Sequence, residues 1–339
     1  MTGYDGSSPA PPVRDAERLH DVVVVGGGAA GLSGALTLAR ARRSVLVVDS
    51  GRPRNAPAAG VHGYLGLDGT PPLELTAAGR AEVLRYGGEI TAGTVTAAER
   101  LAAGGFRLRL DDGTTVAAGR LLVATGLADG LPGVPGLAEL WGRDVLHCPY
   151  CHGWEVRDLP IGVLSTGPAA VRQALLWRQW SADVTLLRHI GPEPGDREYE
   201  RLAARGVAVV DGEVTGLETS GGRLAGVRLT DGRTVPCRAL VVAPRFTARA
   251  AFLAGLGLET VEQTAGGHVL GERVAADATG ATAVPGVWVA GDVADLAGKV
   301  AGAAAAGVSA AAAINADLVE EETGRAVAAR AGLGREVLR

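Results

Sequence analysis

Short apolar runs alternate with helix-compatible segments along this chain. Residues 21–25 form a continuous β-branched run, typical of a buried parallel strand, and a glycine-rich turn and a helix-compatible segment to about Arg40 follow it. A second apolar run, residues 44–48, ends at an acidic residue, Asp49. The same order recurs at residues 161–164, 168–180 and 183–187. The pattern therefore predicts two β-α-β units.

A longer internal repeat indicates that these units belong to two related folds. Residues 106–110, the turn Asp112-Gly113 and residues 120–124 match residues 226–229, the turn Asp231-Gly232 and residues 239–243. In both copies the alanine that closes the last strand lies eleven residues after the turn glycine. Asp-Gly is a natural hairpin turn because glycine accepts a positive φ. We expect an α/β protein with two Rossmann-like dinucleotide-binding domains, the second inserted in the first.

The domain boundaries follow from the places where the two copies interrupt each other. The chain is expected to cross between domains near residues 126–130 and 244–248. After the second crossing, residues 285–292 predict a strand that ends in Gly-Asp, and an Ala-rich helix follows over about 300–314. We expect a flexible tail at 1–20, a split first domain at 21–128 and 247–325, an inserted domain at 129–246, and a C-terminal tail at 326–339.

Composition and charge narrow the classes of partner. The 339 residues are 47% hydrophobic and 21% charged, with a net charge of −4 and a pI of about 5.9. An acidic balance gives no electrostatic reason to expect binding to nucleic acid or to an anionic membrane. No apolar run is expected to reach the roughly 18 residues of a membrane span. The first twenty residues lack a basic start followed by an apolar core, so a cytoplasmic protein is expected.

The first glycine turn has the features of a nucleotide site. Gly26, Gly28 and Gly31 form G-x-G-x-x-G between a strand and a helix, and Asp49 follows eighteen residues after the last glycine. Such glycines allow a tight turn, close approach of a pyrophosphate and close helix–strand packing, and the acid accepts from ribose hydroxyls. The alternative is a glycine turn without a ligand. The residues expected to contact the nucleotide here are Gly26, Gly28, Ala29, Ala30, Gly31, Asp49 and Ser50.

The end of the chain indicates which nucleotide binds. Gly291-Asp292 follows an apolar strand, and an Asp in this place can hold a sugar-alcohol hydroxyl of a flavin while the next helix directs its positive end at the pyrimidine edge. Together with Thr125-Gly126 and the first glycine turn, this is the pattern of flavoproteins with two dinucleotide folds. Lys299 and Val300 are expected to approach the same pyrimidine edge.

The string from His147 to His152 carries the most chemical information. Cys148 and Cys151 are three residues apart and can close a small disulfide ring, and a thiolate at the start of a helix is stabilised. His147 and His152 flank the pair and titrate near neutrality, so they can exchange protons with a thiol. Haem attachment, a zinc site and an inert pair are the alternatives, and either histidine could have a purely structural role. Zinc would need two more ligands, whereas Cys237 is isolated and expected to be buried, so no metal site is expected.

At this point the chain resembles the low-molecular-weight thioredoxin reductase family over nearly all of residues 20–325. The resemblance implies that FAD binds to the split domain and that the inserted domain carries the C-x-x-C. It further implies that Cys151 lies against the isoalloxazine, that Cys148 exchanges with the substrate, and that the protein forms a homodimer.

Two departures from that family bear on function. The second glycine turn, residues 165–170, begins with Ser165 and contains Pro168, and both work against pyrophosphate binding. The arginine-rich segment expected for a 2′-phosphate is replaced by residues 187–196, which contain one Arg and two acids. We therefore expect that the NADPH site is lost.

The second departure is His152, which stands where reductases carry an acidic residue. With the motif from His62 to Gly69, it resembles the dithiol oxidases of natural-product pathways, of the holomycin and gliotoxin types. That resemblance implies a FAD-dependent dithiol oxidase that closes a disulfide in a small dithiol, such as reduced holomycin, and passes the electrons to O₂ with release of H₂O₂. The alternatives are a thioredoxin-disulfide reductase fed by NADPH or ferredoxin, and a non-catalytic flavoprotein that sequesters a dithiol.

Overall fold

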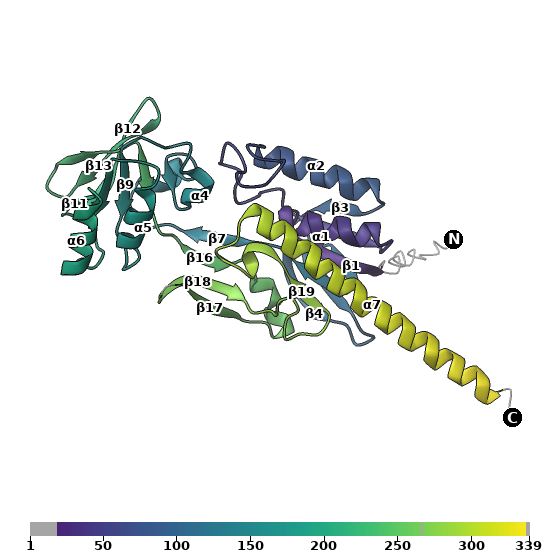
Figure 1. Ribbon diagram of the computed structural model, residues 1–339. Helices are drawn as coiled ribbons and strands as arrows, with labels where there is room; N and C mark the ends of the chain where they lie inside the picture. Colours follow the sequence, from purple (N-terminus) through teal and green to yellow (C-terminus); the bar gives the residue numbers. More distant parts are fainter. Residues whose placement is uncertain (1–18, 266, 337–339) are drawn as a thin grey trace, which may run out of the picture.

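The protein has two lobes that are joined by a pair of strands (Figure 1). The computed structural model describes residues 19–265 and 267–336. Leu19 and His20, which the sequence assigns to a flexible tail, begin the first strand, and the remainder of that tail lies outside the described residues. We call the two lobes the outer domain and the inserted domain.

The outer domain is built on a seven-stranded sheet with the order β3-β2-β1-β6-β5-β4. β1, β2 and β3 are parallel to β6, and β19 pairs in parallel with the end of β6 beyond β5. The strands are β1 (Leu19–Val25), β2 (Val45–Asp49), β3 (Glu89–Ala92), β4 (Val95–Arg100), β5 (Phe106–Leu110), β6 (Thr115–Val123) and β19 (Val287–Val289). The β-branched run of β1 is buried from Val22 to Val25, because apolar residues cover both faces of the sheet.

α1 and α7 cover one face of this sheet (Figure 1), whereas η1 packs on the opposite face. α1 begins directly after the first glycine turn and packs against α7. The helical segments are α1 (Ala29–Arg40), α2 (Pro72–Arg85), the 3₁₀ helices η1 (Ala251–Leu256) and η2 (Gly291–Val293), and α7 (Val300–Glu336).

The inserted domain repeats this plan on a smaller scale. Its parallel sheet has the order β11-β10-β9-β15-β8, in which β9 and β15 correspond to β1 and β6. Its strands are β8 (Val145–Leu146), β9 (Ile161–Leu164), β10 (Val184–Leu187), β11 (Ala208–Val210), β12 (Val214–Ser220), β13 (Arg223–Leu229), β14 (Thr234–Pro236) and β15 (Ala239–Val241). Its helices are α3 (Leu137–Leu140), α4 (Pro149–His152), α5 (Ala170–Trp177) and α6 (Asp196–Ala204).

The expected hairpins and crossovers are present. Asp112-Gly113 joins β5 to β6 and Asp231-Gly232 joins β13 to β14, both antiparallel. The repeat is incomplete in one respect, because the counterpart of the continuous β6 is divided between β14 and β15 in two separate sheets. The crossing strands β7 (Leu127–Gly130) and β16 (Arg245–Ala248) pair with each other and, with β17 (Thr260–Ala265) and β18 (His268–Val274), form a four-stranded sheet.

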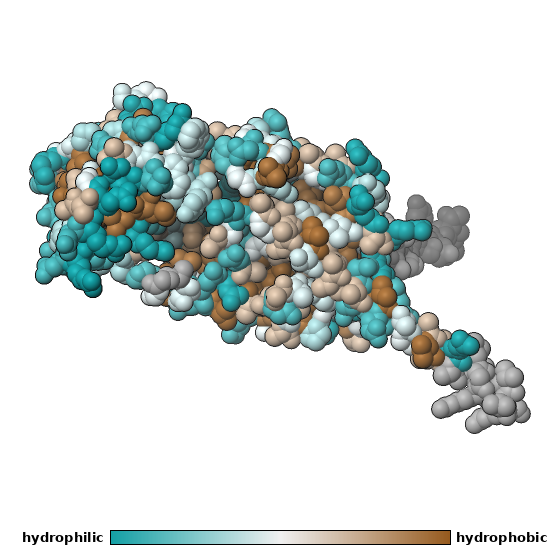
Figure 2. Space-filling view, in the orientation of Figure 1, coloured by the Kyte–Doolittle hydropathy of each residue, from teal (hydrophilic) through white to brown (hydrophobic). Residues whose placement is uncertain are grey.

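The C-terminal helix differs most from the expectation. The sequence pattern predicts an end near residue 314, but α7 continues to Glu336, so the expected C-terminal tail is helical up to that residue. Residues 300–336 contain no proline, and a single glycine such as Gly324 does not end a helix that is rich in alanine. Beyond the residues that face α1, the helix leaves the body of the protein (Figures 1 and 2).

α7 is an exception to the expectation that no apolar run is long enough to span a membrane. Its segment Val300–Arg330 is long and apolar enough, by length and composition alone, to span a membrane. Within the fold, however, the first half of α7 is a core helix: Ala310, Ala311 and Ile314 are fully buried, and a Cβ at Gly307 would collide with the carbonyl oxygen of Ala30. The small residues of this helix therefore pack against α1 of the same chain.

Candidate active site

A cavity of about 1210 Å³ lies between the first glycine turn, the crossing strands and the segment that carries the two cysteines. This exceeds the range of about 300–1,000 Å³ that is common for single ligands, so there is room for a dinucleotide and a second molecule. The predicted site residues that line it are Gly26, Gly28, Ala29, Ala30, Asp49, Ser50, Thr125, Gly126, His147, Cys148, Cys151, His152, Gly291, Asp292, Lys299 and Val300. Gly31 lies behind the wall.

The three glycines of the first turn occupy different environments. Gly26 has φ +106°, and a Cβ there would collide with the carbonyl oxygen of Ala124. A Cβ at Gly31 would collide with the carbonyl oxygen of Gly26. At Gly28, in contrast, a Cβ would meet no atom within 4 Å, so this side of the turn faces open space. The turn is tight, closely packed behind and open in front, as a pyrophosphate cradle requires.

The start of α1 leaves its backbone donors free for an anion. Gly28 is the N-cap and offers no side chain to the first turn of the helix, so the N–H groups there face the cavity without a side-chain cap. Asp49 lies against the turn, where it accepts a hydrogen bond from the backbone N–H of Gly27 (3.0 Å) and forms an ion pair with Arg80. The residues present therefore fit the phosphates and ribose of a nucleotide.

The opposite wall is formed by η2 and the start of α7. Asp292 projects from η2, and burial raises the pKa of its carboxyl group, whereas the charge of Arg54 works against that shift. Lys299, just before α7, places its Nζ 4.9 Å from the centre of the Tyr150 ring on the inserted domain. The start of α7 is thus in contact with the cysteine segment as well as with the cavity.

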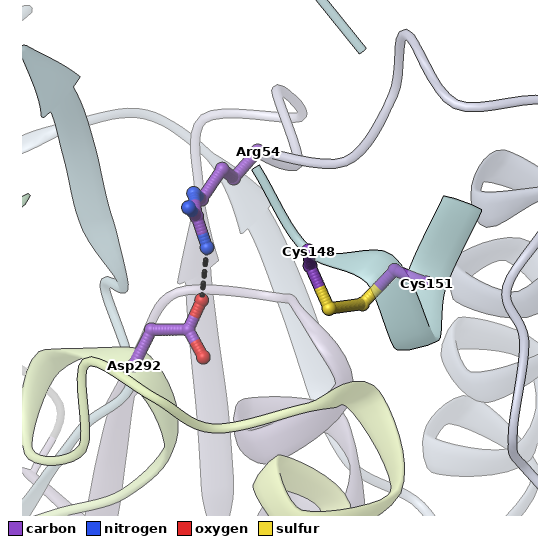
Figure 3. Close-up of a disulfide and its surroundings, with 4 residues drawn as sticks. All are labelled: Arg54, Cys148, Cys151 and Asp292. Atoms are coloured by element: carbon purple, nitrogen blue, oxygen red, sulfur yellow. Dashed lines mark hydrogen bonds and ion pairs between the residues drawn. A yellow bond between two sulfur atoms is a disulfide. The ribbon is translucent and has the colours of Figure 1, made fainter. Parts of the chain in front are cut away.

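Cys148 and Cys151 form a disulfide at the start of the single-turn helix α4 (Figure 3). Their Cα atoms are 5.3 Å apart, within the usual range for disulfides. Cys148 occupies the N-cap position of this helix. Pro149 at the first helical position fixes the turn, and the backbone N–H groups of Cys151 and His152 donate to the carbonyl oxygen of Cys148. Both sulfurs line the cavity.

His147 is half-buried between two aromatic rings. It stacks on Trp141, with ring centres 5.6 Å apart, and contacts the edge of Phe246 at 5.7 Å. Burial lowers the pKa of His147 to about 4, and the positive charge of Arg54 acts in the same direction. His147 is therefore an uncharged imidazole at neutral pH and can act as a base next to Cys148.

His152 closes α4 and is also half-buried in the cavity wall. Burial lowers its pKa, Glu155 raises it, and His62 lowers it further. The net direction is downward, so this imidazole too favours its neutral form. Both histidines are thus able to accept a proton from a thiol close to the disulfide.

Sequence analysis missed Arg54, which lies beside the disulfide in the same cavity (Figure 3). It holds Asp129 of β7 with two hydrogen bonds (2.6 and 2.8 Å) and Asp292 with a third (3.1 Å). Its guanidinium group also lies 5.2 Å from the centre of the Phe246 ring on β16. Arg54 therefore fixes both crossing strands to the outer domain. A single arginine in a loop gives no sequence signal, because its partners are 75 and 238 residues away.

The second glycine turn is arranged differently from the first. Ser165 is buried, and the loop after β10 lies on it so closely that a Cβ at Gly191 would collide with the Ser165 hydroxyl group. His189 in that loop accepts a hydrogen bond from the backbone N–H of Val214 (3.0 Å). The loop after β10 therefore packs on the second turn at Ser165, which corresponds to Gly26, whereas Gly167, which corresponds to Gly28, is as open as Gly28.

Arg188, the one arginine after β10, is held by two carboxylates. It forms ion pairs with Glu193 (3.1 Å) and Asp211 (2.6 Å). A phosphate would have to compete with both acids for this guanidinium group.

The remaining candidates concern metals and the third cysteine. Within residues 19–265 and 267–336, no group of three or more His, Cys, Asp or Glu side chains is placed to hold a metal ion. Cys237 is buried as expected, and burial raises the pKa of its thiol to about 12.

Known proteins resemble this chain over most of its length. The model of the pyridine nucleotide-disulphide oxidoreductase family matches residues 20–316. Thioredoxin reductase aclD of Aspergillus oryzae is 32% identical over 82% of this chain and 89% of its own length. Thioredoxin reductase tcpT of Claviceps purpurea is 42% identical, but that match spans only 44% of this chain and 47% of the relative.

Solved structures of known proteins are also similar to this chain over most of its length. The crystal structure of HlmI has a TM-score of 0.85 and 47% identity and covers 92% of this chain and 96% of that chain. An oxidoreductase from Agrobacterium tumefaciens has a TM-score of 0.82 and 37% identity, over 89% of this chain and 99% of that chain. The two-domain fold, the thioredoxin reductase-like resemblance and FAD as cofactor are thereby confirmed. The chain belongs to the pyridine nucleotide-disulphide oxidoreductase family.

Proposed function

We propose that this protein is a FAD-dependent dithiol oxidase that closes an intramolecular disulfide in a small molecule and uses O₂ as electron acceptor. The observation that carries the proposal is the contrast between the two glycine turns. The first turn shares its cavity with the disulfide, whereas at the second turn Ser165 takes the place of Gly26 and packs against Gly191. A buried serine in place of a required glycine supports an enzyme that takes its electrons from a thiol and not from NADPH.

The chemistry begins with thiol–disulfide exchange. A neutral imidazole, His147 or His152, takes a proton from a substrate thiol, and the thiolate attacks Cys148. A bond forms between the substrate sulfur and Cys148, and Cys151 leaves as a thiolate. The second substrate thiolate then attacks the substrate sulfur, so that the cyclic disulfide departs and Cys148 becomes a thiolate.

The reduced cysteines must next be reoxidised. FAD, when bound, would supply the acceptor for the electron pair of the two thiolates, and O₂ would take up that pair with the two thiol protons to give H₂O₂. Cys148 and Cys151 recover their disulfide in that step. Over one turnover a dithiol and O₂ give a disulfide and H₂O₂, and no nicotinamide is consumed.

We propose a dithiolopyrrolone such as reduced holomycin as the substrate class, within a natural-product biosynthesis or self-resistance pathway. The likeness to HlmI supports this choice, as do relatives such as aclD and sirT, named thioredoxin reductases. A cytoplasmic homodimer belongs to the same proposal. Since those relatives carry the name thioredoxin reductase, a reductase acting on a protein disulfide is the second candidate.

The test is H₂O₂ release from a panel of small dithiols, reduced holomycin included, without any nicotinamide. We expect turnover by the wild type and a loss on the order of a thousandfold in Cys148→Ser, in Cys151→Ser and, to the same extent, in the double variant, because the two sulfurs act as a unit. Unchanged O₂ consumption in these variants would contradict a role of the cysteine pair, whereas binding of dithiols by the wild type without O₂ consumption would indicate a flavoprotein that only sequesters them.

A further inference from the structure

The motif from His62 to Gly69 has no part in the chemistry described so far, yet it contributes to the cavity wall. A bridge between Val61 and Thr70 closes the loop, and Gly63, Gly66 and Gly69 have φ of +70°, +81° and +80°, which lets the chain turn sharply. The loop belongs to the outer domain, and His62 lines the same cavity as the disulfide. Its ring is therefore in a position to serve the cysteine segment.

One ring nitrogen of His62 contacts a carboxylate of the same loop. The Nδ1 atom of His62 lies 3.4 Å from Oδ2 of Asp68, and the backbone N–H of Gly63 donates to Oδ1 of the same carboxylate (2.8 Å). The Gly63 N–H and the His62 ring both lower the pKa of Asp68, so this carboxylate is ionised at neutral pH.

The other ring nitrogen of His62 reaches across to the inserted domain. Its Nε2 lies 3.3 Å from Oε1 of Glu155, which follows His152 by three residues. The contact joins residues that are 93 positions apart in the sequence, and the two side chains are 24% and 37% exposed. His62 is therefore flanked by a carboxylate on each side, one from each domain.

The two contacts of His62 limit where hydrogen atoms can lie on its ring and on the two carboxylates. An ionised carboxylate only accepts hydrogen bonds, and a neutral imidazole donates from one nitrogen only. Both contacts of His62 are satisfied when its two nitrogens carry hydrogen, or when Glu155 itself is protonated. The hydrogen between Nε2 of His62 and Glu155 can therefore lie on either group without loss of a contact.

His152 is the group that such a cluster would serve. It lines the cavity beside Cys151, and the charged or titratable groups that act on it are Glu155, His62 and His147. An imidazole that has taken a proton from a thiol becomes a cation, and Glu155 stabilises that cation.

We propose that Asp68, His62 and Glu155 form a proton relay for His152. When His152 removes a proton from the substrate thiol, the proton moves on to Glu155, and it returns when O₂ takes up two electrons and two protons to give H₂O₂. The inference rests on the proposed dithiol oxidation. His62 and Glu155 act through His152 and are positioning residues, and the relay gains and loses the same proton in each turnover.

The test is the rate at which dithiothreitol reduces the FAD of the whole protein in a stopped-flow instrument without O₂, between pH 6 and 9. We expect His62→Gln and Glu155→Gln to slow this reduction about 10- to 100-fold, a part of the effect of general base catalysis. Their rate of reduction by dithionite, which needs no thiol proton, should equal that of the wild type. His268→Gln and Glu139→Gln, outside the cavity, serve as matched controls with no expected effect.

The pH profile separates a relay from a purely structural contact. Because Glu155 raises the pKa of His152 and His62 lowers it, the acidic limb should move to lower pH in Glu155→Gln and to higher pH in His62→Gln. Should His62→Gln lose FAD, Glu155→Gln on the other domain decides. Normal rates and an unshifted profile in both variants would overturn the relay alone. A wild-type protein that dithiothreitol does not reduce would overturn the proposed function, and the relay with it.

Discussion

The outer and inserted domains show how one fold can keep or lose a ligand site. Both arrange their central parallel strands in the same order, with β1 and β6 of one corresponding to β9 and β15 of the other, and both place a glycine-containing turn after the first strand. What differs is the first residue of the turn. Gly26 has no side chain, whereas Ser165 in its place carries a hydroxyl group that is buried against Gly191. Fold alone therefore does not assign a nucleotide to either turn.

A loop arginine after the second strand of each domain, Arg54 in one and Arg188 in the other, shows a further contrast. Arg54 is held by Asp129 and Asp292, which are only 10% and 22% exposed, and it builds the floor of the cavity. Arg188 is held by Glu193 and Asp211, which are 70% and 72% exposed, and its charge is used at the surface. The two arginines, which do not occupy corresponding positions in the repeat, thus serve as a structural support in one domain and a surface ion pair in the other.

The largest expected effect comes from filling the two turns with the same side chain. Gly28 and Gly167 correspond in the repeat, neither has a positive φ, and nothing lies within 4 Å of a Cβ at either position. We expect Gly28→Val to weaken FAD binding by at least about 100-fold, or about 2.8 kcal/mol, since the side chain enters the space of the pyrophosphate. Gly167→Val should leave FAD content and turnover unchanged. FAD absorbance per protein measures the first effect, and equal losses in both variants would contradict the comparison.

A second pair of variants compares the two arginines. Arg54→Gln leaves Asp129 and Asp292 without their cation, and because these groups are only partly buried we expect a loss of about 2 kcal/mol, between the values for exposed and for fully buried ion pairs. Arg188→Gln should change the melting midpoint little, because exposed ion pairs are weak. Thermal unfolding monitored by circular dichroism tests both. If the two variants melt alike, Arg54 does not fix the crossing strands as described.

The smallest expected effect is a pH dependence that arises from His147. Its pKa falls from 6.5 to about 4 on folding, so between these values the unfolded chain binds more protons than the folded one. His147 should therefore not lower the free energy of unfolding above about pH 6.5, and it should lower it progressively as the pH falls toward 4. The variant His147→Gln should lose this part of the dependence. Urea unfolding midpoints at pH 4.5, 5.5 and 7 measure it, and identical slopes in both proteins would show that His147 is not buried as a neutral base.

Short-range patterns in the sequence were sufficient to predict the main elements of the site. The G-x-G-x-x-G turn, the Cys148–Cys151 pair and both crossings depend on short-range patterns, such as strand–turn–helix order and Asp-Gly hairpins, and the structure places them as expected. The change at Ser165 was also visible, because a side chain replaces a required glycine. The length of α7 was not, because an alanine-rich segment gives no signal at which a helix must end.

Contacts between distant segments could not be predicted in this way. Arg54 meets Asp292 across 238 positions, His62 meets Glu155 across 93, and Gly191 covers Ser165 from the end of the next strand. Each depends on how whole elements pack, and a single sequence carries no pattern that pairs them. The first two contacts support the cavity and join the two domains beside it, and the third packs the second turn.

The central claim is that electrons enter from a thiol and not from NADPH. It is tested most directly by titrating the FAD-loaded protein without O₂, first with NADPH and then, in a separate sample, with dithiothreitol, while the flavin absorbance is recorded. The account predicts that NADPH leaves the oxidised spectrum unchanged and that the dithiol bleaches it. Bleaching by one equivalent of NADPH would contradict the account.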